Sequence, residues 1–463
     1  MNNLAFFRID EEKCVNCHQC IAVCSAKYAN NGLNDVITVD SDLCIGCGEC
    51  IKACTHNARI PLDDFEIALM ALEQKEKIIA VVAPAVASNF PYKYLKLNGW
   101  LKSLGVEAIF DVSFGAELTV KSYIEHVQKN NPKLVIAQPC PAIVRYIQIY
   151  KPELIQYLAP ADSPMLHTMK MVKQFYSKYK NHKMLVVSPC VAKKAEFLET
   201  GIGDYNVTIT SIQNYLEEKN IKLSSFPEVD FDNDPAERAV LFSSPGGLLE
   251  TAERKVPNMR YQSRKIEGPH IIYNYIDKLE EQVEKGMSPL LIDCLNCELG
   301  CNGGTGTNSH DKSPDELEFY INQRKLEFQE KHNTLGNNES KIALYEKTVD
   351  KYWTEGLYDR DYANLSSNTK NIKIPNEDQL NEIYISMNKH EEADHKNCSS
   401  CGYDSCKIMA TAIFNNLNKK ENCHHYLHEE LHETTTELNN QKDEIIADSE
   451  AVLNLIQKIR QLI

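Results

Sequence analysis

Cysteine is the residue type in this chain whose number and spacing point to chemistry. The 463 residues include 17 cysteines, which fall into groups near the N-terminus, in the middle and near the C-terminus. In a long chain with no pattern of a secretory signal, such thiols are expected to stay reduced, and clustered reduced thiols usually bind metal. The cysteines therefore predict three kinds of metal centre.

The N-terminal group repeats one spacing twice. The pattern C-x2-C-x2-C-x3-C runs from Cys14 to Cys24 and again from Cys44 to Cys54. Three thiolates on a tight loop can bind three corners of a cubane, and the fourth thiolate comes from the other repeat. This arrangement resembles a two-cluster bacterial ferredoxin, and zinc is a poor alternative because zinc sites seldom interlock in this order. The expected ligand sets are Cys14, Cys17, Cys20 and Cys54 for one cluster, and Cys44, Cys47, Cys50 and Cys24 for the other.

The central cysteines follow β-rich runs. KLVIAQPC ends at Cys140, KMLVVSPC ends at Cys190, and PLLIDCLNCELGC supplies Cys297 and Cys301. Ligands gather at the carboxyl ends of strands in α/β domains, so these four thiolates can converge on one buried cubane. Cys140 and Cys190 also precede expected helices, whose free N–H groups favour a thiolate.

The elements that must position these cysteines alternate along residues 61–340. The expected strands are KIIAVVAP, VEAIFDV, KLVIAQPC, KMLVVSPC, AVLFSS and PLLIDC, and IIYNYIDKLEEQVEKG is an expected helical stretch. This alternation is typical of α/β layers. The expected domains are a cluster domain at 1–62, a main domain at 63–340, a strap or linker at 341–390, a C-terminal cysteine module at 391–425 and a terminal helix at 426–463.

Three central motifs resemble those of the FeFe (iron-only) hydrogenase family. The family signatures TSCCP, MPCxxKxxE and ExMxCxxGCxxGGG are similar to AQPCP at 137–141, SPCVAKKAE at 188–196 and DCLNCELGCNGGTG at 293–306. The resemblance implies an α/β fold with a two-lobed domain for the H-cluster, a cubane linked to a two-iron subsite that carries carbon monoxide, cyanide and an azadithiolate. It implies that Cys301 bridges the cubane and the subsite.

The resemblance also implies roles around that cofactor. Lys193, held by Glu196, is expected to hydrogen-bond an anionic cyanide ligand. Pro84 and Ala85, in VVAPAV, are expected to contact the cofactor. The glycine-rich run is expected to let the backbone approach the cofactor, because side chains would occupy its space. Its members are Gly300, Gly303, Gly304 and Gly306.

The chain departs from the family where protons should move. Pro139 stands where the family has the cysteine that relays protons to the cofactor, and proline cannot transfer a proton. The other departures are Ser188 and Leu295 for methionines, Met165 for a glutamine, and Tyr123 and His126 for outer glutamates. We therefore expect slow turnover, with Cys294, Glu117 and Glu250 as candidate substitutes in the proton route.

The C-terminal group, Cys398, Cys401, Cys406 and Cys423, resembles an added 4Fe-4S module of the sensory branch of this family. His395, His424 and His425 lie nearby, so zinc stays an alternative. A line of apolar residues follows at heptad spacing: Leu431, Leu438, Ile445, Val452 and Ile459. This line indicates either a surface helix lying on its own protein or a weak homodimeric coiled coil.

Composition limits the remaining possibilities. The formal net charge of -15 disfavours nucleic acid and anionic membrane as partners, and no apolar run is long enough to span a membrane. A cytoplasmic location is expected. The resemblance implies H2 and protons as reactants, a ferredoxin-like redox partner and maturation proteins that supply the cofactor. The competing hypothesis is a non-catalytic iron–sulfur scaffold without the two-iron subsite, related to cytosolic cluster-assembly proteins.

Overall fold

A computed structural model describes residues 4–309, 311–331 and 338–462. The chain forms two compact units, each assembled from separate stretches of sequence. The first unit contains Met1–Lys13 and Asp40–Lys370, and the second contains Cys14–Val39 and Asn371–Ile463. The segments expected as single pieces at 1–62 and 341–390 are therefore each divided between the two units.

A four-stranded parallel sheet organises one lobe of the first unit. Its strand order is β6-β5-β8-β9, from Ile109–Asp111, Ile78–Val82, Lys183–Ser188 and Tyr205–Thr208. All five residues of β5 are buried, as expected for a continuous β-branched run at the centre of a parallel sheet. One of its faces packs against α3, Phe65–Glu73, α5, Tyr94–Ser103, and α10, Ile209–Glu218. The strands expected from KIIAVVAP, VEAIFDV and KMLVVSPC are thus confirmed.

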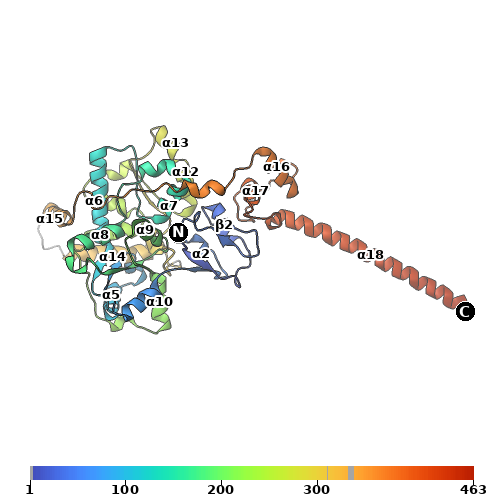
Figure 1. Ribbon diagram of the computed structural model, residues 1–463, viewed down its shortest axis with the longest axis horizontal. Helices are drawn as coiled ribbons and strands as arrows, with labels where there is room; N and C mark the ends of the chain where they lie inside the picture. The colour runs from blue at the N-terminus through green and yellow to red at the C-terminus, as the bar shows by residue number, and fades with distance from the viewer. Residues whose placement is uncertain (1–3, 310, 332–337, 463) are drawn as a thin grey trace. The chain divides into compact units, whose positions relative to one another are not determined.

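A three-stranded parallel sheet organises the other lobe. Its order is β10-β11-β7, from Ser263–Glu267, Leu291–Leu295 and Val135–Ile136. The expected stretch IIYNYIDKLEEQVEKG forms two helices, α12, Pro269–Asp277, and α13, Leu279–Glu284. Figure 1 shows α12 and α13 at one end of this unit and α5 and α10 at the other. The predicted α/β, two-lobed fold is confirmed.

Long helices join the two lobes. The pair α6 and α8, at Val112–Asn130 and Pro164–Phe175, packs together through buried side chains that include Phe114, Met165 and Met169. The remaining α-helices of the first unit are α2 Glu49–Lys52, α4 Val86–Asn89, α7 Pro141–Tyr150, α9 Lys193–Thr200, α11 Gly247–Ala252, α14 Pro314–Lys331 and α15 Asn338–Lys351.

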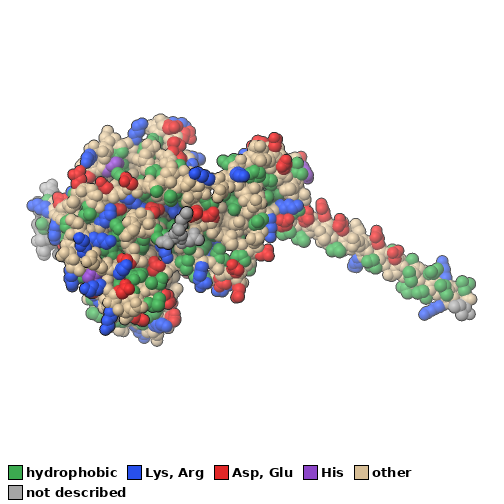
Figure 2. Space-filling model, viewed as in Figure 1, with side chains coloured by type: hydrophobic (Ala, Val, Ile, Leu, Met, Phe, Trp, Pro, Cys, Tyr) green, Lys and Arg blue, Asp and Glu red, His purple; other side chains and the backbone are tan. Residues whose placement is uncertain are grey.

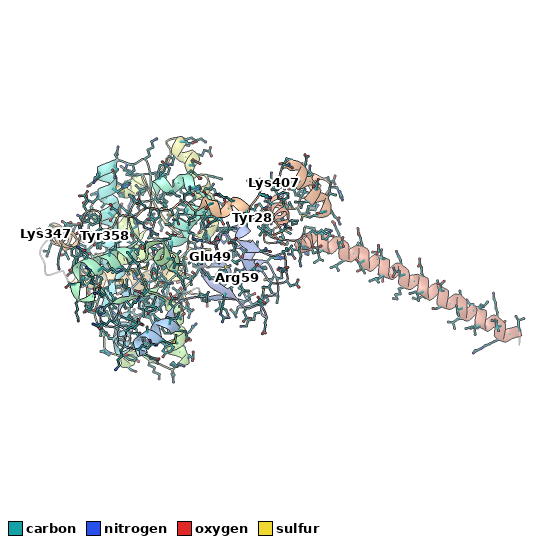
Figure 3. The ribbon with its side chains drawn as sticks, in the orientation of Figure 1. Tyr28, Glu49, Arg59, Lys347, Tyr358 and Lys407 are labelled. Atoms are coloured by element: carbon teal, nitrogen blue, oxygen red, sulfur yellow. The ribbon has the colours of Figure 1, made fainter. Side chains whose placement is uncertain are left out.

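The strap aromatics belong to the core of the first unit. Tyr352 and Tyr358 are buried against Phe114 and the other residues of this apolar cluster, with Tyr358 stacked on the His167 ring. Figure 3 labels Tyr358 within the body of this unit. The part of the expected strap that ends at residue 370 therefore belongs to the first unit, and its aromatic side chains pack in that unit's core.

One predicted strand is wrong. AVLFSS forms a 3-10 helix, η5, at Ala239–Ser243. The buried Glu117 carboxylate accepts hydrogen bonds from the backbone N–H groups of Glu237, Arg238 and Ala239 at 3.0 to 3.1 Å. A carboxylate at this position satisfies the free N–H groups of a helical turn, so a β-rich sequence is held as a helix.

The second unit joins the first cysteine repeat to the C-terminal module. It contains α1, Gln19–Ala22, the antiparallel strands β2, Asn30–Asn31, and β3, Thr38–Val39, and the helices α16, Glu377–Ser386, α17, Cys406–Phe414, and α18, His424–Leu462. A capping box formed by Asn376 and Gln379 begins α16.

Helix α18 confirms the predicted terminal helix but not its packing on the protein. Among the described residues of α18, Tyr426 alone is buried, and the five heptad residues are 49% to 66% exposed. The second unit itself therefore leaves this apolar line exposed. Among the described residues, no helix is long and apolar enough to cross a membrane.

Candidate metal centre and cofactor pocket

The four central cysteines follow strands from both lobes. Cys190 follows β8 after one residue, whereas Cys140 follows β7 and Cys297 and Cys301 follow β11. Cys140 is the N-cap of α7, as predicted, but α9 begins only at Lys193, so Cys190 lies in a turn before that helix. The Cys190 N–H donates to Ser188 Oγ at 3.3 Å, which fixes this turn.

The four thiols converge in the first unit. Burial raises the pKa of Cys301 well above its ordinary value, and the neighbouring Cys297, Cys140 and Cys190 raise it further. Burial likewise raises the pKa of Cys297 to about 12 and that of Cys190 to about 11. Four mutually close thiols in a buried site would repel one another as thiolates. The positive charge of bound iron offsets this repulsion and keeps the coordinating thiols deprotonated.

This geometry is suited to a cluster. Within the described ranges, no three side chains of His, Cys, Asp or Glu are grouped closely enough to hold a single metal ion. A cubane needs a different spacing, since each thiolate binds a different iron atom. The donor set of four cysteines from three strand ends fits one 4Fe-4S cluster.

A small cavity of about 70 Å³ adjoins Cys301. Most of its lining is apolar, and Lys193, Ser188, Ser243 and Cys301 supply the polar or sulfur-bearing groups. The apolar lining includes Pro84, Ala85, Val112, Pro139, Met165 and Phe242. Pro84 and Ala85 thus share this cavity with Cys301, while their contact with a cofactor stays a prediction. The single thiol beside an apolar space fits a two-iron group with diatomic ligands.

Lys193 is held at the cavity by two hydrogen bonds. Its ammonium donates to the Pro139 carbonyl at 3.1 Å and to Glu196 Oε2 at 2.9 Å. Burial opposes the charge of Glu196, but Lys193 and Arg360 outweigh burial and hold the pKa of Glu196 below its ordinary value. Arg360 pairs with the other Glu196 oxygen at 2.9 Å. Lys193 is thus a fixed cation, and Arg360, which sequence reasoning missed, completes its support.

The glycine-rich run also makes close contacts within the protein. A Cβ atom at Gly304 would lie 2.4 Å from the Pro189 carbonyl oxygen, and one at Gly303 would lie 2.8 Å from the Leu299 Cβ. At Gly306 it would lie 2.9 Å from the Cys190 nitrogen. The space beside these glycines is therefore filled by protein, and the glycines allow the loop that carries Cys301 to pack against the loop that carries Cys190.

Pro139 lines the same cavity as Cys301, so the side chain at this position cannot donate a proton there. The candidate substitutes have other partners. Cys294 is buried and donates to the Ala137 carbonyl at 3.5 Å, Glu117 pairs with Arg254 at 2.6 Å, and the Glu250 carboxylate pairs with Lys325 at 3.0 Å. Ser243, which sequence reasoning missed because its run was assigned to a strand, is the hydroxyl group at the cavity on the η5 side.

The outer relay positions are also occupied differently. The Tyr123 hydroxyl is buried and accepts from the Gln138 N–H at 3.3 Å, and His126 contacts Asn130 on the same helix. Leu295 is buried on β11. Neither Tyr123 nor His126 supplies a carboxylate, so these residues do not reproduce the glutamates that the resemblance implies.

His167 is a buried histidine behind Met165 that nothing in its sequence context indicated. Its Nδ1 lies 3.1 Å from the Ser163 carbonyl oxygen and its Nε2 lies 2.8 Å from Ser122 Oγ. A carbonyl can only accept, so Nδ1 carries the proton and Nε2 accepts from Ser122. Burial, opposed by hydrogen bonding to the Ser163 backbone, lowers the pKa of His167 from 6.5 to about 3. The ring is therefore neutral in the folded protein.

This neutral ring predicts acid sensitivity. Below pH 6.5 the unfolded chain binds a proton at His167 that the folded chain does not bind until about pH 3. The free energy of unfolding should therefore decrease by up to about 1.4 kcal/mol for each unit of falling pH in that window. A His167→Gln variant should show a flatter loss of thermal midpoint between pH 6.5 and 4. Equal slopes for both proteins would contradict the assignment.

The second ferredoxin-like repeat adjoins the central site within the first unit. Gly48, with a φ of +80°, follows Cys47, and a Cβ there would lie 2.6 Å from the Thr305 Cβ. The Arg145 guanidinium on α7 donates to the Cys44 carbonyl at 2.7 Å. Burial and the neighbouring Cys50 raise the pKa of Cys44 to about 11. The loop at 44–54 is thus fixed against the loop that carries Cys301.

The remaining cysteines lie in the second unit or complete the second repeat. Cys14, Cys17, Cys20 and Cys24 belong to the second unit, whereas Cys54 belongs to the first, where its sulfur accepts the Ala58 N–H at 3.3 Å. The crossed ligand sets stay a prediction. The four C-terminal cysteines, Cys398, Cys401, Cys406 and Cys423, line a single small cavity together with His424 and His425.

Family models match three parts of the chain. "Iron only hydrogenase large subunit, C-terminal domain" matches residues 76–305, "4Fe-4S dicluster domain" matches 6–58, and "Putative Fe-S cluster" matches 394–425. These matches agree with the central, N-terminal and C-terminal cysteine groups in turn.

The curated relatives include hydrogenases and an iron–sulfur cluster assembly factor. Iron hydrogenase 1 of Clostridium pasteurianum is 27% identical over 53% of this chain and 50% of its own length. The periplasmic [Fe] hydrogenase large subunit of Nitratidesulfovibrio vulgaris is 30% identical over 55% of this chain and 68% of its own length. The cytosolic Fe-S cluster assembly factor narfl of Danio rerio is 22% identical over 65% of this chain and 86% of its own length. The chain thus spans only half the length of the first of these relatives.

A solved structure agrees on the fold. An [FeFe]-hydrogenase studied for the oxygen inactivation of its H cluster has a TM-score of 0.50 and 18% identity, and the match covers 65% of this chain and 99% of that one. This likeness supports the fold alone. The hydrogenase relatives and the matching motifs together show that the chain belongs to the iron-only (FeFe) hydrogenase family.

Proposed function

We propose that this protein is a slow or sensory FeFe hydrogenase that converts H2 reversibly to protons and electrons. The observation that carries the proposal is the small apolar cavity beside Cys301, whose lining includes Lys193 with its ammonium held by Glu196. The two-iron part of the H-cluster, when bound there, would supply the centre at which H2 is split or formed. A scaffold that holds only cubanes has no need of a buried cation at such a cavity.

The chain's own residues would divide the work. Cys140, Cys190, Cys297 and Cys301 would hold the cubane, and Cys301 would also bind the two-iron subsite. Lys193, supported by Glu196 and Arg360, would orient an anionic cyanide ligand. The apolar lining from Pro84, Ala85 and Phe242 would exclude water. Because Pro139 offers no proton at the cavity, we propose that proton transfer limits turnover.

Three further 4Fe-4S clusters would carry the electrons. Two would use the N-terminal cysteines in the crossed sets Cys14, Cys17, Cys20, Cys54 and Cys44, Cys47, Cys50, Cys24. The third would use Cys398, Cys401, Cys406 and Cys423, where zinc is the alternative. A ferredoxin-like one-electron carrier would exchange electrons with them, and separate maturation proteins would install the two-iron subsite.

Infrared spectroscopy of anaerobically purified protein, co-expressed with maturation factors, tests the proposal. We expect CO and cyanide stretching bands, which no amino acid produces, and a shift of these bands under H2. The second candidate function is an iron–sulfur scaffold, favoured by Pro139 and by the likeness to the Danio rerio assembly factor. Intact cubanes without such bands would overturn the hydrogenase proposal in favour of the scaffold.

We also propose that α18 pairs with α18 of a second copy as a parallel coiled coil. Figure 2 shows hydrophobic side chains gathered toward the end of this helix, where Val452, Leu455, Ile459 and Leu462 fit two heptads of apolar a and d positions. Parallel pairing places this apolar segment of one copy beside the same segment of the second copy. It also places Glu437 at a g position opposite Lys442 at an e position of the second copy.

This pairing predicts a concentration-dependent dimer. Val452→Asp should convert the full-length protein to a monomer in sedimentation velocity, because it places two like charges in the apolar seam. Ala447→Asp, which lies outside the a and d positions, is the matched control and should leave the dimer unchanged. A monomeric wild type at all concentrations would contradict the proposal.

A further inference from the structure

Two cysteine loops that are far apart in sequence touch within the second unit. Gly402, which follows Cys401, has a φ of +86°. A Cβ atom there would lie 2.9 Å from the Ile21 Cβ and 3.0 Å from the His18 carbonyl oxygen. Ile21 follows Cys20 in the first N-terminal repeat. The backbones therefore meet one residue away from a predicted cluster ligand on each side, and only glycine allows this approach.

Lys27 ties the two loops together at the same point. Its ammonium donates to the carbonyl groups of Ala22 at 2.6 Å, Ile21 at 3.2 Å and Gly402 at 3.2 Å, and it pairs with Asp404 at 3.2 Å. The Lys27 side chain is 13% exposed. A mostly buried cation with three carbonyl partners on both loops fixes their separation far more firmly than a surface ion pair would.

Buried aromatic residues fill the rest of the junction. Tyr403, two residues after Cys401, is fully buried, and its hydroxyl accepts a hydrogen bond from Asn418 Nδ2 at 3.4 Å. Tyr28, labelled in Figure 3, is half-buried beside α17 and hydrogen-bonds to Thr411. These aromatic side chains pack between the two cysteine loops.

A second seam continues the contact along the chain. The Gly32 N–H donates to the Leu417 carbonyl at 2.7 Å, and Asn422 Nδ2 donates to the Gly32 carbonyl at 2.9 Å. Asn422 directly precedes Cys423. The hydrogen-bonded loops thus bring the segment that carries Cys423 against the segment that follows the first repeat.

We infer that this junction is an electron-transfer joint between the cluster of the first N-terminal repeat and the C-terminal cluster. With both clusters bound, one electron would pass from the reduced cluster at one loop to the oxidised cluster at the other, with no proton moved and no bond formed. A one-electron carrier protein would supply or remove that electron at the C-terminal cluster, where the proposed ligand Cys398 is exposed. The inference rests on the proposed cluster content, but it does not require the two-iron subsite.

The cysteine loop of the second N-terminal repeat has a similar glycine contact. In the first unit, the positive-φ Gly48 follows Cys47 and lets that loop contact Thr305, which lies in the loop after Cys301. A positive-φ glycine directly after a cluster cysteine thus marks a close loop contact in each unit. We therefore assign the C-terminal module an electron-transfer role rather than a purely structural one.

Electron paramagnetic resonance of the dithionite-reduced full-length protein, made without maturation factors, tests the joint. Cys406→Ala with Cys423→Ala should remove the C-terminal cluster. If the clusters adjoin, subtracting the variant spectrum from the wild-type spectrum leaves features split by magnetic interaction, and the remaining N-terminal signal relaxes more slowly. A difference spectrum of one isolated cluster, with unchanged relaxation of the rest, would overturn the inference.

A glycine variant tests the contact with every cluster retained. Gly402→Ala should reduce the magnetic interaction while the iron content stays at the wild-type level, and Lys27→Met should do the same if Gly402→Ala fails to bind iron. Gly286→Ala is the control, because Gly286 also has a positive φ of 68° but nothing lies within 4 Å of its added Cβ. Infrared bands report on the hydrogenase proposal separately, so the two proposals can fail independently.

Discussion

A Pro139→Cys variant should produce hydrogen about 10²- to 10⁴-fold faster than the wild type, which is the usual contribution of a positioned proton donor. Pro139 lines the cavity beside Cys301, and a thiol there would stand where the family places its relay cysteine. The position precedes the N-cap of α7 and is only partly buried, so a smaller side chain should fit without rearrangement. Hydrogen evolution with a chemical reductant measures the effect.

Two other replacements at the same position separate proton transfer from shape. Pro139→Ala removes the ring without adding an acid, and Pro139→Ser adds a hydroxyl that is a much weaker acid than a thiol. We expect both variants to stay near the wild-type rate. If Pro139→Cys keeps its infrared bands and gains no rate, proton transfer at this position does not limit turnover, and the proposed cause of slow turnover fails.

Local patterns were sufficient to predict the elements that carry the central site. Unbroken β-branched runs such as Ile78–Val82 form buried parallel strands, and the cysteines after β7, β8 and β11 converge as the strand-end rule requires. The resemblance supplied the roles of Lys193 and Cys301, and contacts at the cavity are consistent with both.

The errors arose where distant residues override local preference. The run at 239–244 has strand-forming residues, but Glu117, more than 100 residues earlier, supplies the acceptor that holds it as a 3-10 helix. The close protein contacts at Gly303 and Gly304 were likewise not predictable, because the atoms nearest an added Cβ belong to Leu299 and Pro189. No sequence pattern reports which of two surfaces a glycine faces.

The division into units was also not readable from the cysteine spacing. The two N-terminal repeats look like one domain because they share a spacing, yet Cys14–Val39 groups with Asn371–Ile463. The contacts responsible involve Lys27, Gly32 and Gly402, single residues with no motif around them. Packing between remote segments depends on shape, which spacing alone does not specify.

A Lys193→Met variant should lose about 10- to 100-fold in hydrogenase activity or in two-iron occupancy, as is usual when a residue that supports a metal group is removed. Methionine fills a similar volume but cannot donate a hydrogen bond. Glu196 would keep its pairing with Arg360 at 2.9 Å, so the fold should survive the change. Infrared band intensity, normalised to the visible absorbance of the cubanes, measures the retained subsite.

Lys194→Met is the matched control, since Lys194 is the next residue along α9 and makes the same kind of ion pair, with Asp64 at 3.1 Å. Its side chain is 30% exposed and does not donate to Pro139 or Glu196, so infrared bands and activity should match the wild type. Lys193→Arg should recover part of the loss only if charge, rather than reach, is what the cavity requires. Equal losses in Lys193→Met and Lys194→Met would mean that Lys193 supports the helix rather than the cofactor.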